Sequence, residues 1–321
     1  MDQPGQALFC LEPEYRERVW GGRRLRAADP PVGEAWLAFG LSRVANGPAA
    51  GRTLDDLAAA RGELLLGPAA VDRFGARFPL IVKLLDCAAW LSVQVHPDDE
   101  QARRLVGPGE FGKTEAWYFV DAPPEAMIMA GVRPGIEPAE LAAAIRSGRV
   151  LDVMADVPVA AGSSLLLPAG TLHSLGPGLL VYEIQEASDI TFRAYDWDRP
   201  QTGGRRLHVE EAVEVARPVG PAPCVQLRPG LGSAVVPGPA CDYFEMALLR
   251  VEPGSPLEST TAGSFQALTV IEGAAAVGAG GETSKAGRFE TILVSAGAGS
   301  CVVSATGGPA TLLRASVPAA S

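Results

Sequence analysis

The sequence predicts an all-β protein with minor helices. Three features support this fold class: 37 glycines and 27 prolines interrupt the 321 residues, apolar runs are brief, and turn residues separate those runs. This pattern is typical of many short strands rather than of long helices. Because 321 residues exceed the usual size of one domain, we expect two domains.

The composition is that of a globular protein. Hydrophobic residues make up 47% of the chain and charged residues 20%. No stretch approaches the roughly 18 uninterrupted apolar residues that a membrane-spanning helix needs. The opening residues, MDQPGQALFCLEPEY, have neither the basic nor the apolar region of a secretory signal. We therefore expect a soluble, cytoplasmic protein with no membrane partner.

Charge and cysteine content exclude two further classes. A net charge of -10 argues against a nucleic-acid partner, because a phosphate backbone requires a basic face. A small anionic substrate is still compatible, since a few local cations in a pocket are enough to bind it. The five cysteines are widely spaced and form no CxxC pair, which predicts reduced packing residues and neither a disulfide framework nor a thiolate zinc site.

Local patterns predict the individual elements. Helix formers at about 3.6-residue spacing predict five helices: Thr53 to Ala60, Ala69 to Phe74, Asp98 to Leu105, Pro138 to Ser147 and Val209 to Ala216. The last third of the chain is rich in glycine and alanine, and four strands are predicted there: Phe244 to Val251, Phe265 to Glu272, Glu290 to Val294 and Ala310 to Ala315.

A proline-rich stretch marks the expected domain boundary. Four prolines between Arg217 and Pro229 prevent a continuous helix and disfavour a central strand. We therefore expect a catalytic domain with helical insertions at 1–217, a linker at 218–229, and a smaller C-terminal β domain at 230–321.

A short motif specifies the all-β fold further. Residues Gly162 to His173 follow the pattern G-x5-P-x-G-x2-H, which resembles the second signature of the cupins. Residues Phe289 to Ser300 repeat the turn of this motif, with serine in place of the histidine. Cupins are double-sheet jelly rolls. The resemblance therefore implies two cupin-like jelly-roll β domains, the second of which is expected to lack the metal.

Two of the three histidines have surroundings that suggest chemistry. Residues Leu91 to His96 alternate strictly between apolar and polar, which predicts a strand that directs Ser92, Gln94 and His96 to one face. His173 follows the turn at Gly170, where glycine adopts a positive φ at little cost. Taken alone, a strand histidine such as His96 is more often a core or surface residue than a ligand.

A second candidate strand carries a charged pair. Lys113 and Glu115 lie on one face of an otherwise apolar run, and charged residues are rarely buried without a partner or a metal. A solvated edge is the alternative for this segment. Together, the side chains of Gln94, His96, Glu115 and His173 offer two imidazole nitrogens and two oxygens, a set that suits one zinc ion with an open position. His208 has no comparable partners, precedes a predicted helix, and is interpreted as structural.

An ordered series of motifs extends over residues 10 to 215. The motifs are YRERVWGG from Tyr15, GEAW from Gly33, PLIVKLL from Pro79, LSVQVHPDD from Leu91, GKTEAWY from Gly112, LLPAGTLHSLGPG from Leu166, and LVYEIQEASDITFRAYDWDR from Leu180. This series resembles one family, the type I mannose-6-phosphate isomerases in their short bacterial form.

The resemblance implies a zinc-dependent aldose-ketose isomerase that interconverts mannose 6-phosphate and fructose 6-phosphate through an enediol. It implies zinc ligation by the four residues already selected. Arg193 and Lys113 correspond to active-site residues of the family, and Lys83 and Ser92 correspond to positions that hold the substrate phosphate. An ammonium and a hydroxyl are suitable donors for a phosphate dianion. The alternative for Arg193 is an exposed cation paired with Asp189 or Asp196.

The sequence leaves the proton-transfer base and the substrate open. Lys113, Glu183 and Asp189 are all candidate bases. Trp90 and the segment from Leu37 to Val44 depart from the family pattern and could change the pocket wall. Two alternatives therefore remain: a metal-binding cupin that acts on another sugar or sugar phosphate, and a non-catalytic sugar-binding cupin. An oxygen-using cupin is disfavoured, because those enzymes prefer iron and this set contains glutamine.

Overall fold

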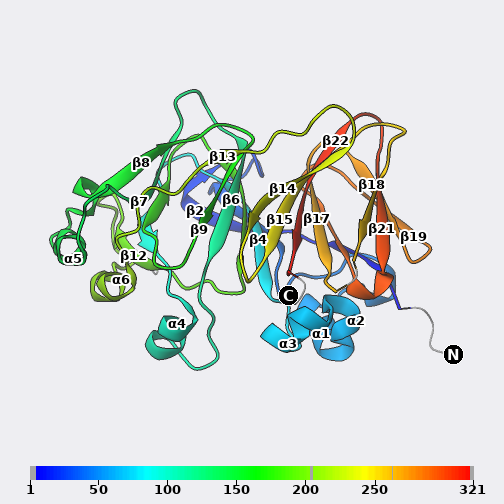
Figure 1. Cartoon of the computed structure of the whole chain (residues 1–321), viewed down its shortest axis with the longest axis horizontal. Coiled ribbons are helices and arrows are strands. Elements are labelled where there is room, and N and C mark those ends of the chain that lie inside the picture. Colours follow the sequence, from blue (N-terminus) through cyan, green and yellow to red (C-terminus); the bar gives the residue numbers. More distant parts are fainter. Residues whose placement is uncertain (1–4, 203–204, 262, 319–321) are drawn as a thin grey trace. The chain divides into compact units, whose positions relative to one another are not determined.

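The structure is a computed structural model that describes residues 5–202, 205–261 and 263–318 (Figure 1). The chain forms two compact units. Unit 1 comprises Met1–Glu14, Ala35–Lys83 and Leu227–Ser321, and unit 2 comprises Tyr15–Glu34 and Leu84–Gln226. The step from unit 2 to unit 1 between Gln226 and Leu227 falls inside the expected linker at 218–229. The units nevertheless differ from the contiguous domains expected from the sequence, because two N-terminal segments belong to the unit that contains the C-terminal strands.

The helices are short and lie between strands. The five helices predicted from the sequence are confirmed, and none of their boundaries differs by more than one residue. Helix α1 begins after Thr53, whose side chain accepts a hydrogen bond from the backbone of Asp56 and stabilises the first turn. The six α-helices and three 3-10 helices of the described residues are α1 (Leu54–Arg61), α2 (Glu63–Leu66), α3 (Pro68–Phe74), α4 (Asp99–Leu105), α5 (Pro138–Arg146), α6 (Val209–Val215), η1 (Gly47–Ala49), η2 (Val150–Asp152) and η3 (Ala296–Ala298).

Unit 2 is built on two antiparallel sheets. One has the strand order β12-β5-β10-β7-β8, and the other has the order β13-β9-β6-β11-β4-β3-β2. Strands β3 and β4 each begin in one unit and end in the other. The bounds are β2 (Glu14–Gly22), β3 (Val32–Ala38), β4 (Leu80–Asp86), β5 (Val93–Val95), β6 (Glu115–Asp121), β7 (Met127–Val132), β8 (Met154–Pro158), β9 (Ser163–Leu167), β10 (His173–Leu175), β11 (Leu180–Glu186), β12 (Phe192–Tyr195) and β13 (Val225–Gln226).

Unit 1 also contains two antiparallel sheets. Their orders are β1-β20-β17-β22-β15-β14 and β16-β21-β18-β19. The four strands predicted for the last third of the sequence are confirmed as β15, β17, β20 and β22. The bounds are β1 (Leu8–Leu11), β14 (Ala234–Ala240), β15 (Glu245–Val251), β16 (Leu257–Thr260), β17 (Gln266–Glu272), β18 (Ala275–Ala279), β19 (Glu282–Ala286), β20 (Thr291–Val294), β21 (Ser300–Ala305) and β22 (Ala310–Ser316).

The two units repeat one topology. Strands β5 to β11 of unit 2 occur in the same chain order as β16 to β22 of unit 1, and each pairs with the equivalent neighbours. Thus β9-β6-β11-β4-β3 corresponds to β20-β17-β22-β15-β14, and β5-β10-β7-β8 corresponds to β16-β21-β18-β19. In each unit a turn carries the chain from one sheet to the other, between β9 and β10 or between β20 and β21. The prediction of two cupin-like jelly rolls is confirmed.

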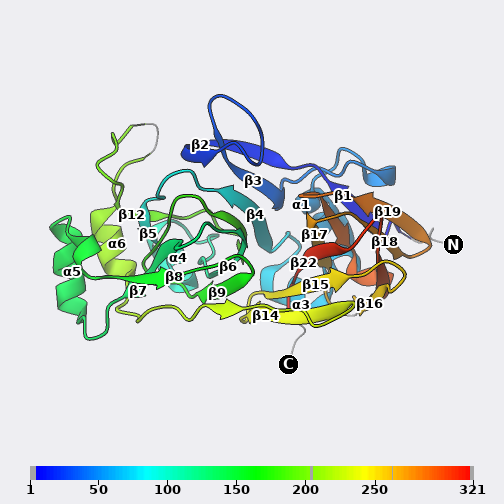
Figure 2. The ribbon, with the colours of Figure 1, turned by 90° about the horizontal axis from the view of Figure 1, so that it is seen from above.

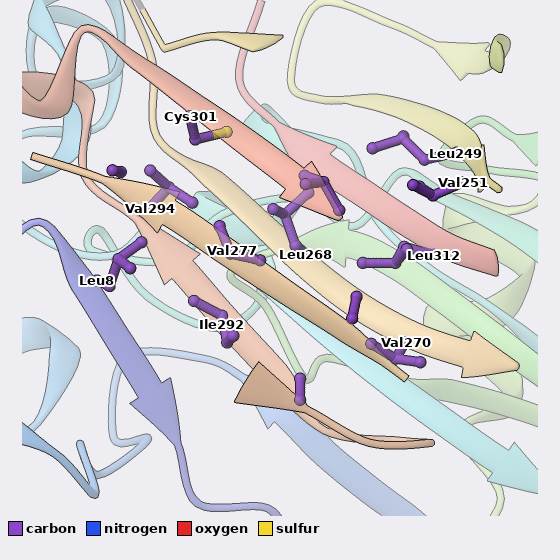
Figure 3. Packing of buried hydrophobic residues seen from close by; sticks show 14 of the residues in the cluster. Leu8, Leu249, Val251, Leu268, Val270, Val277, Ile292, Val294, Cys301 and Leu312 are labelled. Atoms are coloured by element: carbon purple, nitrogen blue, oxygen red, sulfur yellow. The ribbon is translucent and has the colours of Figure 1, made fainter. Parts of the chain in front are cut away.

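Buried apolar residues fill the space between the two sheets of each unit. In unit 1, Leu268 and Leu312 from one sheet meet Val277 and Cys301 from the other (Figure 3). In unit 2, the corresponding core includes Trp117 and other residues of β6, β7, β9, β10 and β11. A second cluster on the outer face of the five-stranded sheet packs against α5 and α6, which lie side by side (Figure 2). The five-stranded sheet of unit 2 therefore packs apolar residues on both faces: the inner face against the other sheet, and the outer face against α5 and α6.

Candidate active site

Strand β5 carries two of the predicted ligands. Val93 and Val95 pack in the outer cluster beneath the helices, so Gln94 between them faces the inside of unit 2. His96 follows the strand, and 2% of its surface is exposed. The predicted alternation is confirmed here, because the outward valines set the direction of the intervening polar side chain.

His173 begins the neighbouring strand β10 and lies directly opposite Gln94 in the register. The turn before it depends on Gly170, which has φ 86° and whose amide donates to the backbone oxygen of His96 at 2.8 Å. A side chain with a Cβ would be strained at this φ. The turn therefore fixes the backbone of one histidine against that of the other.

Glu115 begins strand β6 and is fully buried. Lys113, two residues earlier, is also buried, and its amide donates to the backbone oxygen of Pro97 at 2.9 Å. A Cβ at Gly112 would come within 2.6 Å of the backbone nitrogen of Asp99, so only glycine permits this close approach. Lys113 and Glu115 are therefore held beside the end of β5, and the solvated-edge alternative is wrong.

The side chains of His96, Glu115 and His173 converge. Their ligand atoms all lie within 4.8 Å of one another. His96 Nε2 is 3.5 Å from Glu115 Oε2, and His173 Nε2 is 3.2 Å from Glu115 Oε1. Gln94 Nε2 is 3.3 Å from His173 Nε2, and a half-turn of its amide would bring Oε1 to the same place. The structure thus brings together all four residues predicted as ligands.

Backbone carbonyls determine which nitrogen of each imidazole faces this cluster. His96 Nδ1 lies 2.7 Å from the backbone oxygen of Ile190, and His173 Nδ1 lies 2.9 Å from that of Thr171. Because a carbonyl only accepts, each Nδ1 carries a proton and each Nε2 presents a lone pair to the cluster. Burial lowers the pKa of His173, which also favours the neutral imidazole.

This donor set fits a divalent metal ion. Two imidazole lone pairs and one carboxylate converge in a buried place, with an amide beside them, and nitrogen and oxygen donors of this kind suit zinc. The Lys113 ammonium contacts the same atoms, since its Nζ is 3.0 Å from His96 Nε2 and 2.9 Å from Glu115 Oε2. Burial lowers the pKa of Lys113, but the attraction of Glu115 and Glu183 raises it more, so the net shift is upward.

Arg193 lies in the same row of side chains. Strand β12 places it opposite Gln94, which in turn is opposite His173. Its neighbours Phe192 and Ala194 pack in the outer cluster, so Arg193 is on the inner face. Its Nη1 donates to the backbone oxygen of Arg206 at 3.1 Å, and no ion pair joins it to a carboxylate among the residues described. The alternative of a cation paired with Asp189 or Asp196 is therefore not supported.

The two residues predicted to hold phosphate are both buried. Ser92 precedes β5, and its Oγ donates to Gln94 Oε1 at 3.4 Å. Lys83 lies in β4, and its Nζ is 4.5 Å from the centre of the Trp36 ring. Ser92 thus contacts a predicted ligand, whereas Lys83 is a buried cation over an aromatic face.

Sequence reasoning missed several contributions to this arrangement. The carbonyls of Ile190 and Thr171 orient the two imidazoles, but a backbone oxygen gives no signal in a sequence. Trp117 packs edge-on against His173, with ring centroids 5.4 Å apart, and its Nε1 donates to Glu183 Oε2 at 3.0 Å. His208 precedes α6 as predicted, and its Nδ1 accepts from the backbone amide of Arg193 at 3.2 Å.

Comparisons with known proteins identify the family. A family model, the phosphomannose isomerase type I catalytic domain, matches residues 8–113. A probable mannose-6-phosphate isomerase from Bacillus subtilis is 42% identical over 217 residues, covering 64% of this chain and 67% of the relative. A mannose-6-phosphate isomerase from Streptococcus mutans is 37% identical over 246 residues, covering 72% and 75%. The chain belongs to the type I phosphomannose isomerase family.

Solved structures agree with this assignment. The mannose 6-phosphate isomerase of Bacillus subtilis superposes with a TM-score of 0.82 at 30% identity, over 97% of this chain and 99% of that one. A zinc-bound mannose 6-phosphate isomerase has a TM-score of 0.75 at 17% identity, over 97% and 99%, and shares the fold. The chain is therefore an isomerase of this family. None of its described helices is long and apolar enough to cross a membrane.

Proposed function

We propose that the chain is a zinc-dependent isomerase that interconverts mannose 6-phosphate and fructose 6-phosphate through an enediol. The observation that carries this proposal is the convergence of His96, Glu115 and His173 beside Gln94, with Lys113 and Arg193 adjacent. A metal-binding cupin that only holds a sugar would not need two cations beside its ligands.

The ligand set would hold one zinc ion. His96 and His173 would donate their Nε2 lone pairs, which the carbonyls of Ile190 and Thr171 already aim at the cluster, and Glu115 and Gln94 would supply oxygen. Bound zinc would act as a Lewis acid that withdraws charge from a sugar oxygen. Lys113 would then give up its present contacts with His96 Nε2 and Glu115 Oε2 and become available to the substrate.

Arg193 and Lys113 would stabilise the charge that develops on the sugar oxygens. Proton removal from C2 of the aldose, or from C1 of the ketose, leaves negative charge on the C1 and C2 oxygens. A fixed guanidinium and an ammonium near these oxygens lower the barrier, because donors aimed at developing charge act more strongly in a buried site. Arg193 is held by its bond to the backbone of Arg206 and by the flanking residues of β12.

Three residues are candidates for the base that transfers the proton. The Asp189 side chain is 59% exposed and lies 3.8 Å from Arg16, which makes it the weakest of the three candidates. Glu183 is buried on the inner face beside Trp117, and Lys113 is buried against the ligands. We therefore propose that Lys113 or Glu183 transfers the proton between C1 and C2.

We also propose that Ser92 and Lys83 each bind the substrate phosphate. Ser92 is a buried hydroxyl next to Gln94, and Lys83 is a buried ammonium. Charge-assisted hydrogen bonds of this kind are suited to a phosphate dianion. Substitution of either residue by alanine is expected to raise KM for the sugar phosphate more than it lowers kcat.

The enediol can be tested by turnover in deuterium oxide. The zinc-loaded protein is incubated with mannose 6-phosphate, and fructose 6-phosphate is analysed by NMR for deuterium at C1. Deuterium incorporation during a single turnover supports the enediol mechanism, in which the base takes a proton from the sugar and exchanges it with solvent before returning it. Turnover with no incorporation at any pH would argue against the exchanging enediol, and no turnover with any hexose phosphate would contradict the isomerase itself.

A further inference from the structure

Unit 1 contains the structural equivalent of the metal cluster. Glu115 begins β6 and pairs with Leu167 at the end of β9, and Gln266 begins β17 and pairs with Val294 at the end of β20. Cys301 of β21 takes the place of His173, because it pairs with Ser259 of β16 as His173 pairs with Gln94 of β5, and it lies in the buried core. Ser300, the residue expected from the sequence motif, is exposed. The carboxylate and imidazole of unit 2 thus correspond to an amide and a thiol in unit 1.

The charge at a neighbouring position is also reversed. Glu183 pairs with Trp117, two residues into β6, and Arg314 pairs with Leu268, two residues into β17. Arg314 is therefore the equivalent of Glu183. The inside of unit 2 carries two carboxylates at these positions, which suits a cation, whereas the inside of unit 1 carries a guanidinium and a neutral amide.

Arg314 faces the space between the two sheets of unit 1. It stands in the register between Leu268 and Ala247, and both of these residues belong to the buried core. Its Nη1 crosses to the other sheet and donates to Ser259 Oγ at 3.1 Å. Solvent reaches part of its surface. Arg314 is thus a cation on the core face of a jelly roll, at the position that Glu183 occupies in unit 2.

The groups around Arg314 are neutral hydrogen-bonding groups. Ser259 and Gln266 bond each other, with Gln266 Nε2 to Ser259 Oγ at 2.9 Å, and Cys301 Sγ lies 3.8 Å from Gln266 Oε1. Burial raises the pKa of Cys301 to about 11, so its thiol supplies no negative charge. No carboxylate forms an ion pair with Arg314 within 5–202, 205–261 and 263–318.

We propose that Arg314, held by its hydrogen bond to Ser259, binds a small oxyanion inside unit 1. The guanidinium offers five donors in a planar fork, and the single hydrogen bond to Ser259 leaves most of them for a ligand. A partly buried cation is stabilised by an anion that can accept two parallel bonds. The ligand chemistry is a phosphate ester or a carboxylate of a small metabolite. This site is separate from the proposed catalytic site and does not depend on it.

The proposal is tested by calorimetric titration of the full-length, zinc-loaded protein with inorganic phosphate and, separately, with acetate. We expect a site for phosphate, acetate or both whose affinity falls about tenfold or more in Arg314→Met. Binding of phosphate alone identifies the ligand as a phosphate compound, and binding of acetate identifies a carboxylate. The site should persist in Ser92→Ala, which separates it from phosphate binding at the catalytic site.

Arg250→Met is the matched control, because Arg250 lies on β15 of the same sheet and already pairs with Glu252. Affinity that is unchanged in Arg314→Met, or lowered equally in Arg250→Met, would overturn the proposal. A second measurement uses the wild-type protein and follows the modification of arginines by phenylglyoxal with mass spectrometry. Phosphate or acetate should slow the modification of Arg314 severalfold and leave the rate for Arg250 unchanged. Equal rates for Arg314 with and without both anions would also overturn it.

Discussion

The two units of this isomerase share one strand topology but carry polar side chains of different charge at corresponding positions. In unit 2 the inner ends of β6, β10 and β11 carry Glu115, His173 and Glu183, and in unit 1 the corresponding positions carry Gln266, Cys301 and Arg314. Both units keep an apolar core between their sheets. The fold therefore requires the core residues and the turn, while the few polar residues at one end of the sheets are free to differ.

The largest expected effect comes from His173, because it would supply a ligand nitrogen to the proposed zinc. His173→Ala should lose bound zinc and turnover together, since one missing ligand opens the site. Zinc content by mass spectrometry and turnover are measured on the same sample. Cys301→Ala, the equivalent change in unit 1, should leave both at the wild-type level. Full zinc and turnover in His173→Ala would remove it from the ligand set.

A smaller loss is expected for Arg193, which would act on the transition state and not on the metal. Arg193→Ala should lower kcat by about 10²-fold, the scale of one lost oxyanion donor, with zinc retained. Arg146→Ala is a suitable control, because this arginine is exposed and pairs with Glu210. A nearly normal kcat in Arg193→Ala would leave the residue with a structural role only.

A third substitution puts the unit 2 residue into unit 1. Gln266→Glu replaces an amide whose Nε2 donates to the backbone oxygen of Thr260 at 2.6 Å. A carboxylate there would face a carbonyl without a proton between them, so the free energy of unfolding should fall by about 1–3 kcal/mol, offset in part by Arg314. Urea unfolding measures this change, and Gln201→Glu is the control, because this exposed amide accepts from the backbone of Leu207 and donates to no carbonyl of the described residues. Equal midpoints for both variants would contradict the buried hydrogen bond.

Much of the fold follows from local patterns, and the misses have physical causes. The helices from Thr53 and Pro138 begin at recognisable capping or proline positions, and their limits were predicted closely. Strands such as Ala275–Ala279 and Glu282–Ala286 were not predicted, because alanine, glycine and charged residues have low strand propensity. Their pairing with each other and with β21 stabilises them instead.

Pairing between strands far apart in the sequence determines which segments belong to each unit, and local sequence patterns do not reveal such pairing. Strand β1 pairs with β20, with Leu8 opposite Val294, and this contact assigns the N-terminus to unit 1. The site was more accessible to sequence reasoning, because alternation in β5 and the Gly170 turn select the inward side chains. The charge reversal at Arg314 was not accessible, since it depends on the registers of two separate sheets.

The central claim is that the cluster of His96, Glu115, His173 and Gln94 holds the zinc on which isomerisation depends. The most direct test measures zinc content and mannose 6-phosphate turnover in one purified sample, before and after treatment with a chelator and after zinc is restored. We expect about one zinc per chain, loss of turnover with the metal, and recovery when zinc returns. Turnover that persists in the metal-free protein would contradict the claim.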